Sequence, residues 1–225
     1  MNELHKALKQ RILNDMYGFT DQELKILRSL DTPIKIQNYI DRLPFNYEKK
    51  GDTHYSVRRV LREKKAHCIE GAIFAAAALK LNGEPPLIMD FSALDNVGDD
   101  DHVIAVYKRG GHYGAISKTN HATIRFRDPV YKTPRELALS YFHEWFMNSN
   151  GLKTLESYAR PLNLNRIKLD WLIGEDDIFE LDDILNALPH YKLVPKGNRK
   201  YLRPADKMEL KAGSFIEWPR SHPRT

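Results

Sequence analysis

A run of small apolar residues from Ala66 to Leu81 constrains the fold more than any other stretch of the sequence. It carries Gly71 and an unbroken row of alanines over 75–78. Because the run is apolar on almost every side, it predicts a buried helix whose small side chains let neighbouring elements approach closely. The following Asn82-Gly83 suits the end of such a helix. The run is too short to span a bilayer, so we expect it at the centre of a globular core.

Helix signals also precede this central segment. Apolar residues recur at helical spacing over 4–13, which predicts a first helix there. A helix that begins near Pro33 is expected to stop before Pro44, since proline disfavours a helical residue ahead of it. Three starts carry a recognisable signal, namely the capping-box pair Thr20 and Glu23, Pro33 itself, and Ser56 ahead of a short helix over Val57–Arg62.

Strand signals follow the central segment, and a two-glycine turn at 110–111 predicts a hairpin. Helices are expected after Pro134 and over Leu181–Leu188. No linker requires a boundary, so we interpret 1–225 as one domain, with a core of about 56–146, an N-terminal helical segment over 1–55 and a C-terminal extension over 147–225. Apolar or alternating runs predict strands at Leu87–Phe91, His102–Tyr107, Tyr113–Ser117 and Thr123–Arg127, and around Ile167–Leu172.

The cysteine count, the N-terminal residues and the net charge bear on the compartment and on the partners we expect for this chain. The single cysteine allows no internal disulfide, which fits a reducing compartment and predicts a cytoplasmic location. The charged N-terminus has no apolar signal-peptide region, and we expect no membrane association. The net charge of +5 comes from Lys and Arg interleaved with Asp and Glu, so nucleic acid is not an expected partner.

Cys68 lies in the first turn of the predicted central helix. The free N–H groups and the dipole at a helix N-terminus favour a thiolate, so we expect the pKa of this thiol to fall. The same N–H groups can hydrogen-bond a developing oxyanion. The alternative is a structural cysteine, a small buried hydrophobe. Its neighbour His67 either lines a cleft or is exposed, and Glu70 is expected to interact with the helix dipole.

His102 opens an apolar strand directly after the acidic turn Gly98–Asp101. A thiol nucleophile needs a base within hydrogen-bond reach, and the start of a strand can present one rigidly. The alternatives are a surface histidine or a metal site that uses the preceding aspartates. The cluster lacks the ligand spacing of zinc or calcium sites, so we expect neither a metal nor an organic cofactor.

Three segments together resemble the transglutaminase-like superfamily of papain-like folds, which is also similar to arylamine N-acetyltransferases. They are AHCIEGAIFAAAALKLNG at 66–83, DHVIAVY at 101–107 and RDPVY at 127–131. The resemblance implies an α+β fold in which N-terminal helices and a buried central helix pack on an antiparallel sheet. It also implies a Cys-His-Asp triad that forms a thioester acyl-enzyme, which water or an amine then resolves.

The third member of that triad has more than one candidate in this sequence. Asp128 matches the family's aspartate by its RDPVY context, and it shares parity with the apolar residues of its predicted strand. Counting back from the hairpin turn, however, places Ser117–Thr119 opposite His102, where there is no aspartate. Ser117 and Asn120 are therefore alternative orienting residues, and an asparagine holds the histidine in papain-like enzymes.

The sequence thus predicts a cysteine-dependent acyl-transfer enzyme, either an amide or peptide hydrolase or a transamidase. Its expected substrate is a peptide, a protein or a small amide or ester. Cys68 would attack the carbonyl carbon, His102 would move the proton, and Asp128 would orient His102. The alternative is a catalytically inactive module of the same fold that binds a peptide or protein partner.

Overall fold

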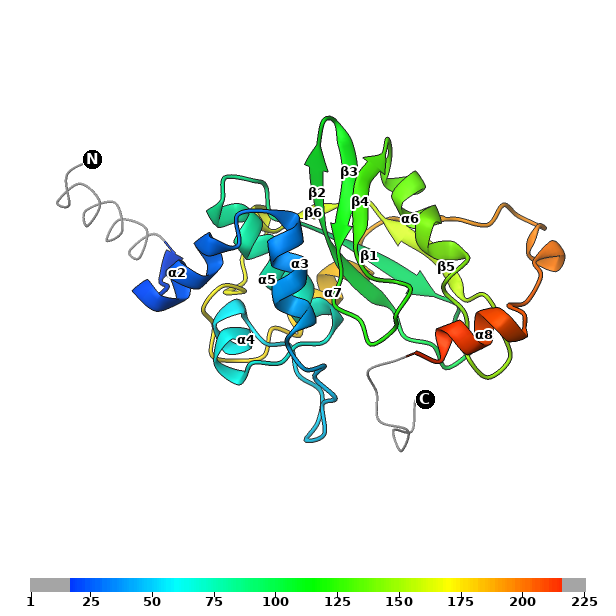
Figure 1. Cartoon of the computed structure of the whole chain (residues 1–225), viewed down its shortest axis with the longest axis horizontal. Coiled ribbons are helices and arrows are strands. Elements are labelled where there is room, and N and C mark those ends of the chain that lie inside the picture. Colours follow the sequence, from blue (N-terminus) through cyan, green and yellow to red (C-terminus); the bar gives the residue numbers. More distant parts are fainter. Residues whose placement is uncertain (1–16, 216–225) are drawn as a thin grey trace.

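The computed structural model describes residues 17–215, and the helix predicted over 4–13 lies outside them. Within this range of the chain, seven α-helices combine with an antiparallel sheet of seven strands, which makes the fold α+β. Figure 1 shows helices α2 to α5 gathered on one side of the sheet and helix α6 on the other. The described helices include none with the length and apolar character needed to cross a membrane.

The N-terminal helices begin where the capping signals predicted. The side chain of Thr20 accepts the Glu23 N–H while the Glu23 carboxylate accepts the Thr20 N–H, a complete capping box. Ser56 likewise accepts the Arg59 N–H at the start of α4. The bounds are Asp21–Ser29 for α2, Pro33–Asp41 for α3 and Val57–Glu63 for α4.

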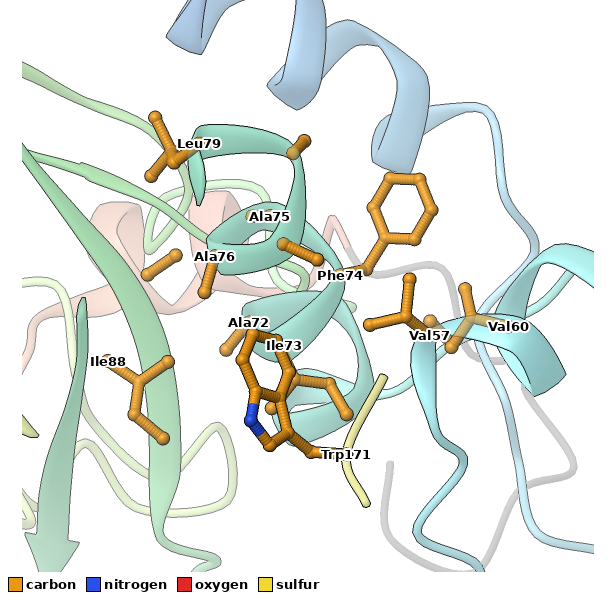
Figure 2. Close-up of a cluster of buried hydrophobic side chains, with 14 of the residues drawn as sticks. Val57, Val60, Ala72, Ile73, Phe74, Ala75, Ala76, Leu79, Ile88 and Trp171 are labelled. Atoms are coloured by element: carbon orange, nitrogen blue, oxygen red, sulfur yellow. The ribbon is translucent and has the colours of Figure 1, made fainter. Parts of the chain in front are cut away.

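Helix α5 (Cys68–Leu81) is the buried centre of the molecule, as predicted from its composition. It packs on the sheet and also contacts α2, α3 and α4. Figure 2 shows this helix between the strand that carries Ile88 and the helix that carries Val57 and Val60. It begins two residues later than the apolar run, because His67 is extended and Ala66 pairs with Phe45 in an isolated bridge.

The sheet has the strand order β4-β3-β2-β1-β5-β7, and β6 pairs with β1 outside this path. A first apolar cluster lies between the sheet and α5, and a second lies between the sheet and α6 (Pro134–Phe142). The strands are β1 (Leu87–Ala93), β2 (His102–Arg109), β3 (His112–Ile116), β4 (Arg127–Tyr131), β5 (Leu155–Ala159), β6 (Leu162–Asn163) and β7 (His190–Lys192).

The prediction of a strand over Thr123–Arg127 was wrong. The chain bends as far as residue 126, and β4 begins only at Arg127. The guanidinium of Arg127 donates to the Thr123 carbonyl, and the Ser117 hydroxyl donates to the Ile124 carbonyl. Because these carbonyls bind side chains, the segment does not pair as a strand. Its alternating apolar residues belong to a loop that is partly buried.

The strand predicted around Ile167–Leu172 was also wrong. The carbonyls of Trp171 and Leu172 accept the N–H groups of Val57 and Arg58, so this segment caps the start of α4 instead of joining the sheet. Helix α7 (Glu180–Asn186) lies within the predicted acidic helix, apart from its first residue. The remaining elements are α8 (Lys207–Gly213) and two short 3-10 turns, Leu164–Arg166 and Arg199–Tyr201.

Candidate active site

A pocket of about 370 Å³ lies where α5 begins and β2 begins. Cys68 and His102 both line it, so the structure brings together the two residues that the sequence selected first. Three loop segments complete the walls, namely the acidic turn 98–101, the loop 118–121 after β3, and the stretch 144–149 after α6. The site therefore combines residues that are far apart in the sequence.

Cys68 is the first residue of α5, at the N-terminal end that favours an anion. Burial alone would raise the pKa of its thiol. Hydrogen bonds and charges from His102 and His67 outweigh burial and lower the pKa to about 6. The thiol is therefore largely ionised at neutral pH, which is the state in which a cysteine acts as a nucleophile.

His102 reaches the thiol through a defined ring nitrogen. Its Nε2 lies 2.8 Å from the Ser117 Oγ, and that hydroxyl is 3.0 Å from the Ile124 carbonyl. A hydroxyl has one proton, and the carbonyl can only accept it, so Ser117 must accept from an Nε2–H of His102. This leaves Nδ1 as the nitrogen that serves the hydrogen bond to Cys68.

Ser117 is itself held by helix α3. The side chain of Gln37 makes two hydrogen bonds of 2.9 Å to its backbone, in which Nε2 donates to the carbonyl and Oε1 accepts the N–H. Both residues are buried. The N-terminal helices therefore position the serine that orients His102, a connection that no local pattern in the sequence indicated.

The candidates for the orienting residue are placed differently. Asp128 is exposed on β4, where its charge acts on Tyr107, and the structure does not bring it to His102. Strand β4 pairs Arg127 with Ala115 and then runs along β3 away from Ser117. Asn120 is buried in the pocket wall. The hydrogen bond to the His102 ring comes from Ser117, which the hairpin count had placed among the residues opposite it.

His67 contacts the thiol from another side. Its Nδ1 lies 3.9 Å from the Cys68 Sγ, and its Nε2 lies 2.7 Å from the Thr53 carbonyl. Burial alone would lower the pKa of this imidazole, but the hydrogen bond that its ring donates to the Cys68 sulfur and the charge of Glu70 outweigh it and raise the pKa to about 10. The sequence left open whether His67 lines a cleft or is exposed; it is buried beside Cys68 and is not among the residues that line the pocket.

Glu70, in the first turn of α5, accepts a set of buried hydrogen bonds next to His67. Its fully buried carboxylate accepts hydrogen bonds from the Asn46 amide, the Thr53 hydroxyl, and the N–H groups of Tyr55 and His67. The carboxylate also lies 3.4 Å from the His67 Nε2. It therefore fixes the loop 46–55 against the first turn of α5 and supplies a negative charge behind His67.

A second pair of residues near the thiol was not predicted. Asp90 of β1 and His190 of β7 lie 2.8 Å apart, and the Asp90 side chain is only 4% exposed. Burial, the Asp101 charge and the Cys68 charge raise the pKa of Asp90, while His190 opposes them; the result is about 6. An aspartate inside the apolar run LIMDF was the one signal that could have singled out this position.

The pocket walls differ in character. On one side the Trp145 indole N–H donates to Asp99 over 2.9 Å, and the same ring packs edge-on against His102 at 5.7 Å. On the other side Lys118 is fully buried and donates to the Leu43 carbonyl over 2.7 Å. A substrate would therefore meet an aromatic and acidic wall opposite a polar loop.

Among the described residues, no group of histidine, cysteine and carboxylate side chains has the arrangement of a metal site. Cys68 is hydrogen-bonded to both His67 and His102, and the other ring nitrogen of each histidine meets a backbone carbonyl or a hydroxyl. In comparisons with known proteins, the chain matches no family model and no curated protein.

Proposed function

We propose that this chain is a cysteine-dependent acyl-transfer enzyme of the transglutaminase-like, papain-like kind. One observation carries the proposal, namely a cysteine at the start of a buried helix, in a pocket, hydrogen-bonded to a histidine that Ser117 orients. The order of the elements supports the papain-like assignment, since the cysteine helix precedes the histidine strand and the orienting residue follows on the next strand's end.

The first half of the reaction forms a thioester. The thiol proton passes to His102 Nδ1, and the Cys68 sulfur attacks the carbonyl carbon of an amide or ester. The carbonyl π electrons move to oxygen, where the N–H groups of the first turn of α5 stabilise the charge. When the carbonyl re-forms, the bond to the leaving group breaks, and His102 gives its proton to the departing amine or alcohol.

The second half regenerates the enzyme. Water or an amine attacks the thioester carbon while His102 accepts the proton of the attacking group. The carbon–sulfur bond then breaks, and the sulfur leaves as a thiolate. Ser117 keeps Nε2 protonated throughout by accepting its hydrogen bond, so Nδ1 remains the nitrogen that exchanges protons. The reaction needs no electron transfer.

The test is trapping of the acyl-enzyme. We expect p-nitrophenyl acetate to release nitrophenolate in a burst, to add one acetyl group to Cys68 by mass spectrometry, and then to turn over. His102→Ala should lose turnover at pH 7 while the purified variant stays folded. Cys68→Ala, which removes the only thiol, sets the background. A thiol that is acylated but never released by water or by an added amine such as glycinamide would contradict an enzymatic role.

The alternative is an inactive module that binds a peptide or protein. It is favoured by one observation, that a serine instead of an acid orients His102. A neutral serine stabilises an imidazolium less than a carboxylate does, because charge-assisted hydrogen bonds are roughly twice as strong as neutral ones. A protein that shows neither burst nor turnover with ester and anilide substrates would leave this alternative in place.

A further inference from the structure

We propose that His67 is a second catalytic histidine, a fixed cation that holds the Cys68 thiolate while His102 alone moves protons. The inference rests on the proposed function and names a residue that acts in the same site. Papain-like chemistry needs only one histidine at the sulfur, so a second buried imidazole beside it calls for a task of its own.

Each ring nitrogen of His67 has one hydrogen-bond partner within reach. Nε2 faces the Thr53 carbonyl at 2.7 Å, and a carbonyl can only accept, so Nε2 carries a proton. Nδ1 faces the Cys68 sulfur at 3.9 Å. A proton on Nδ1 as well makes the ring a cation whose two N–H groups both have acceptors, the carbonyl on one side and the thiolate on the other.

The charged groups around the ring favour that cation. The Glu70 carboxylate lies 3.4 Å and the Glu48 carboxylate 3.7 Å from Nε2. The ring of His54 meets the His67 ring edge-on at 5.5 Å, and its own Nε2 pairs with Asp182 at 2.8 Å. His102 also hydrogen-bonds the sulfur, and Asp90 interacts with the thiolate through its charge.

The two histidines are anchored in ways that suit different tasks. The His67 Nε2 lies next to a backbone carbonyl and the buried Glu70 carboxylate, so loss of the ring's charge would remove a positive charge 3.4 Å from that carboxylate. His102 sits on a neutral hydroxyl and lines the pocket where the leaving group and water would be. In the cycle described above, the proton therefore goes from sulfur to His102 and on to the leaving group, and His67 keeps both of its protons.

The experiment measures alkylation of Cys68 by iodoacetamide from pH 4.5 to 10, together with ester turnover. Glutamine at 67 can still donate to the Thr53 carbonyl but carries no charge. We expect His67→Gln to raise the alkylation midpoint by at least one pH unit, which lowers the thiolate fraction at pH 6 by roughly fivefold or more. Its turnover should recover as the pH rises, whereas His102→Ala should not recover. His112→Gln, at a partly exposed position on β3 outside the pocket, is the matched control and should leave both curves unchanged.

The outcomes separate the two proposals. An alkylation curve for His67→Gln that coincides with wild type and control overturns the role of His67, whatever the turnover. A shifted curve in a protein that turns over no ester supports the role of His67 and counts against the enzymatic function. If His67→Gln does not fold, ¹⁵N-histidine NMR of the wild type decides. One ring must stay doubly protonated at pH 8 and lose a proton when Cys68 is alkylated, and absence of such a ring refutes the inference.

Discussion

Replacement of Gly71 by alanine sets two physical effects against each other. Gly71 lies in the second turn of α5, where alanine would ordinarily strengthen a helix by about 0.5–1 kcal/mol. A Cβ at this position, however, would lie 2.3 Å from the Lys118 Cβ and 3.1 Å from its Cγ. The nearest atom is bonded directly to the backbone, so a side-chain rotation cannot remove the overlap.

We expect the steric overlap with Lys118 to cost more free energy of folding than the gain in helix propensity contributes. Extra volume in a filled core costs about 1–3 kcal/mol, and Lys118 is held at its far end by the Leu43 carbonyl, which limits how it can yield. Subtracting the gain in helix propensity leaves a net loss centred on about 1 kcal/mol, with an upper end of about 2.5 kcal/mol. For a chain of this size, a loss of about 1 kcal/mol corresponds to a fall in Tm of roughly 2–4 °C. Because Lys118 follows Ser117, we also expect slower acylation of Cys68.

Urea unfolding with tryptophan fluorescence measures the free energy, and a double-mutant cycle tests the cause. If the Cβ overlap is responsible, Gly71→Ala should cost much less in a Lys118→Gly background, which has no Cβ to meet. Equal costs in the two backgrounds would place the effect elsewhere. A Gly71→Ala protein more stable than wild type would refute the reasoning, because helix propensity would then outweigh the close approach.

Two further predictions concern the groups around the thiol. Ser117→Ala leaves the His102 Nε2–H and a backbone carbonyl buried without this partner, so we expect a loss of about 2–4 kcal/mol in urea unfolding and at least tenfold slower ester turnover; unchanged turnover would contradict the orienting role. The raised pKa of Asp90 means that the fold binds this proton more tightly than the unfolded chain, so ionisation destabilises the fold. The free energy of unfolding of the wild type, relative to that of Asp90→Asn, should therefore fall by at most about 3 kcal/mol as the pH rises from about 4 to 6. A difference that rises or stays constant over this range would refute the prediction. Asp128→Asn, at an exposed position, is the control.

Local signals were enough for the helices and for the place of Cys68 at the start of one of them. Capping residues such as Thr20 and Ser56 act within three residues, and the alanine run around Gly71 announces burial by composition alone. The position of Cys68 at the start of α5 follows from the same run. His102 was selected because an apolar strand begins directly at it. Counting residues back from the hairpin turn between β2 and β3 placed Ser117 among the residues opposite His102.

The rest depended on contacts that no local pattern encodes. Asp128 has the right sequence context, but the register of β4 against β3 carries it away from the site. The hydrogen bonds between Gln37 and Ser117 join residues that are 80 positions apart in the sequence. The hydrogen bond between His190 and Asp90 joins residues that are 100 positions apart. The residues over 123–127 alternate with the period of a strand. The carbonyls of Thr123 and Ile124, however, accept hydrogen bonds from side chains and not from a neighbouring strand.

The low pKa of Cys68 belongs to the folded molecule and not to the sequence around it. In an unfolded chain a cysteine has a pKa near 8.5, so only about 3% of it is thiolate at pH 7. With the pKa of about 6 in the fold, roughly nine-tenths is ionised at the same pH. The pKa therefore falls only once residues such as His102 have closed around the thiol. Because it is the only cysteine, its labelling rate near neutral pH reports how much of a sample has reached the native state.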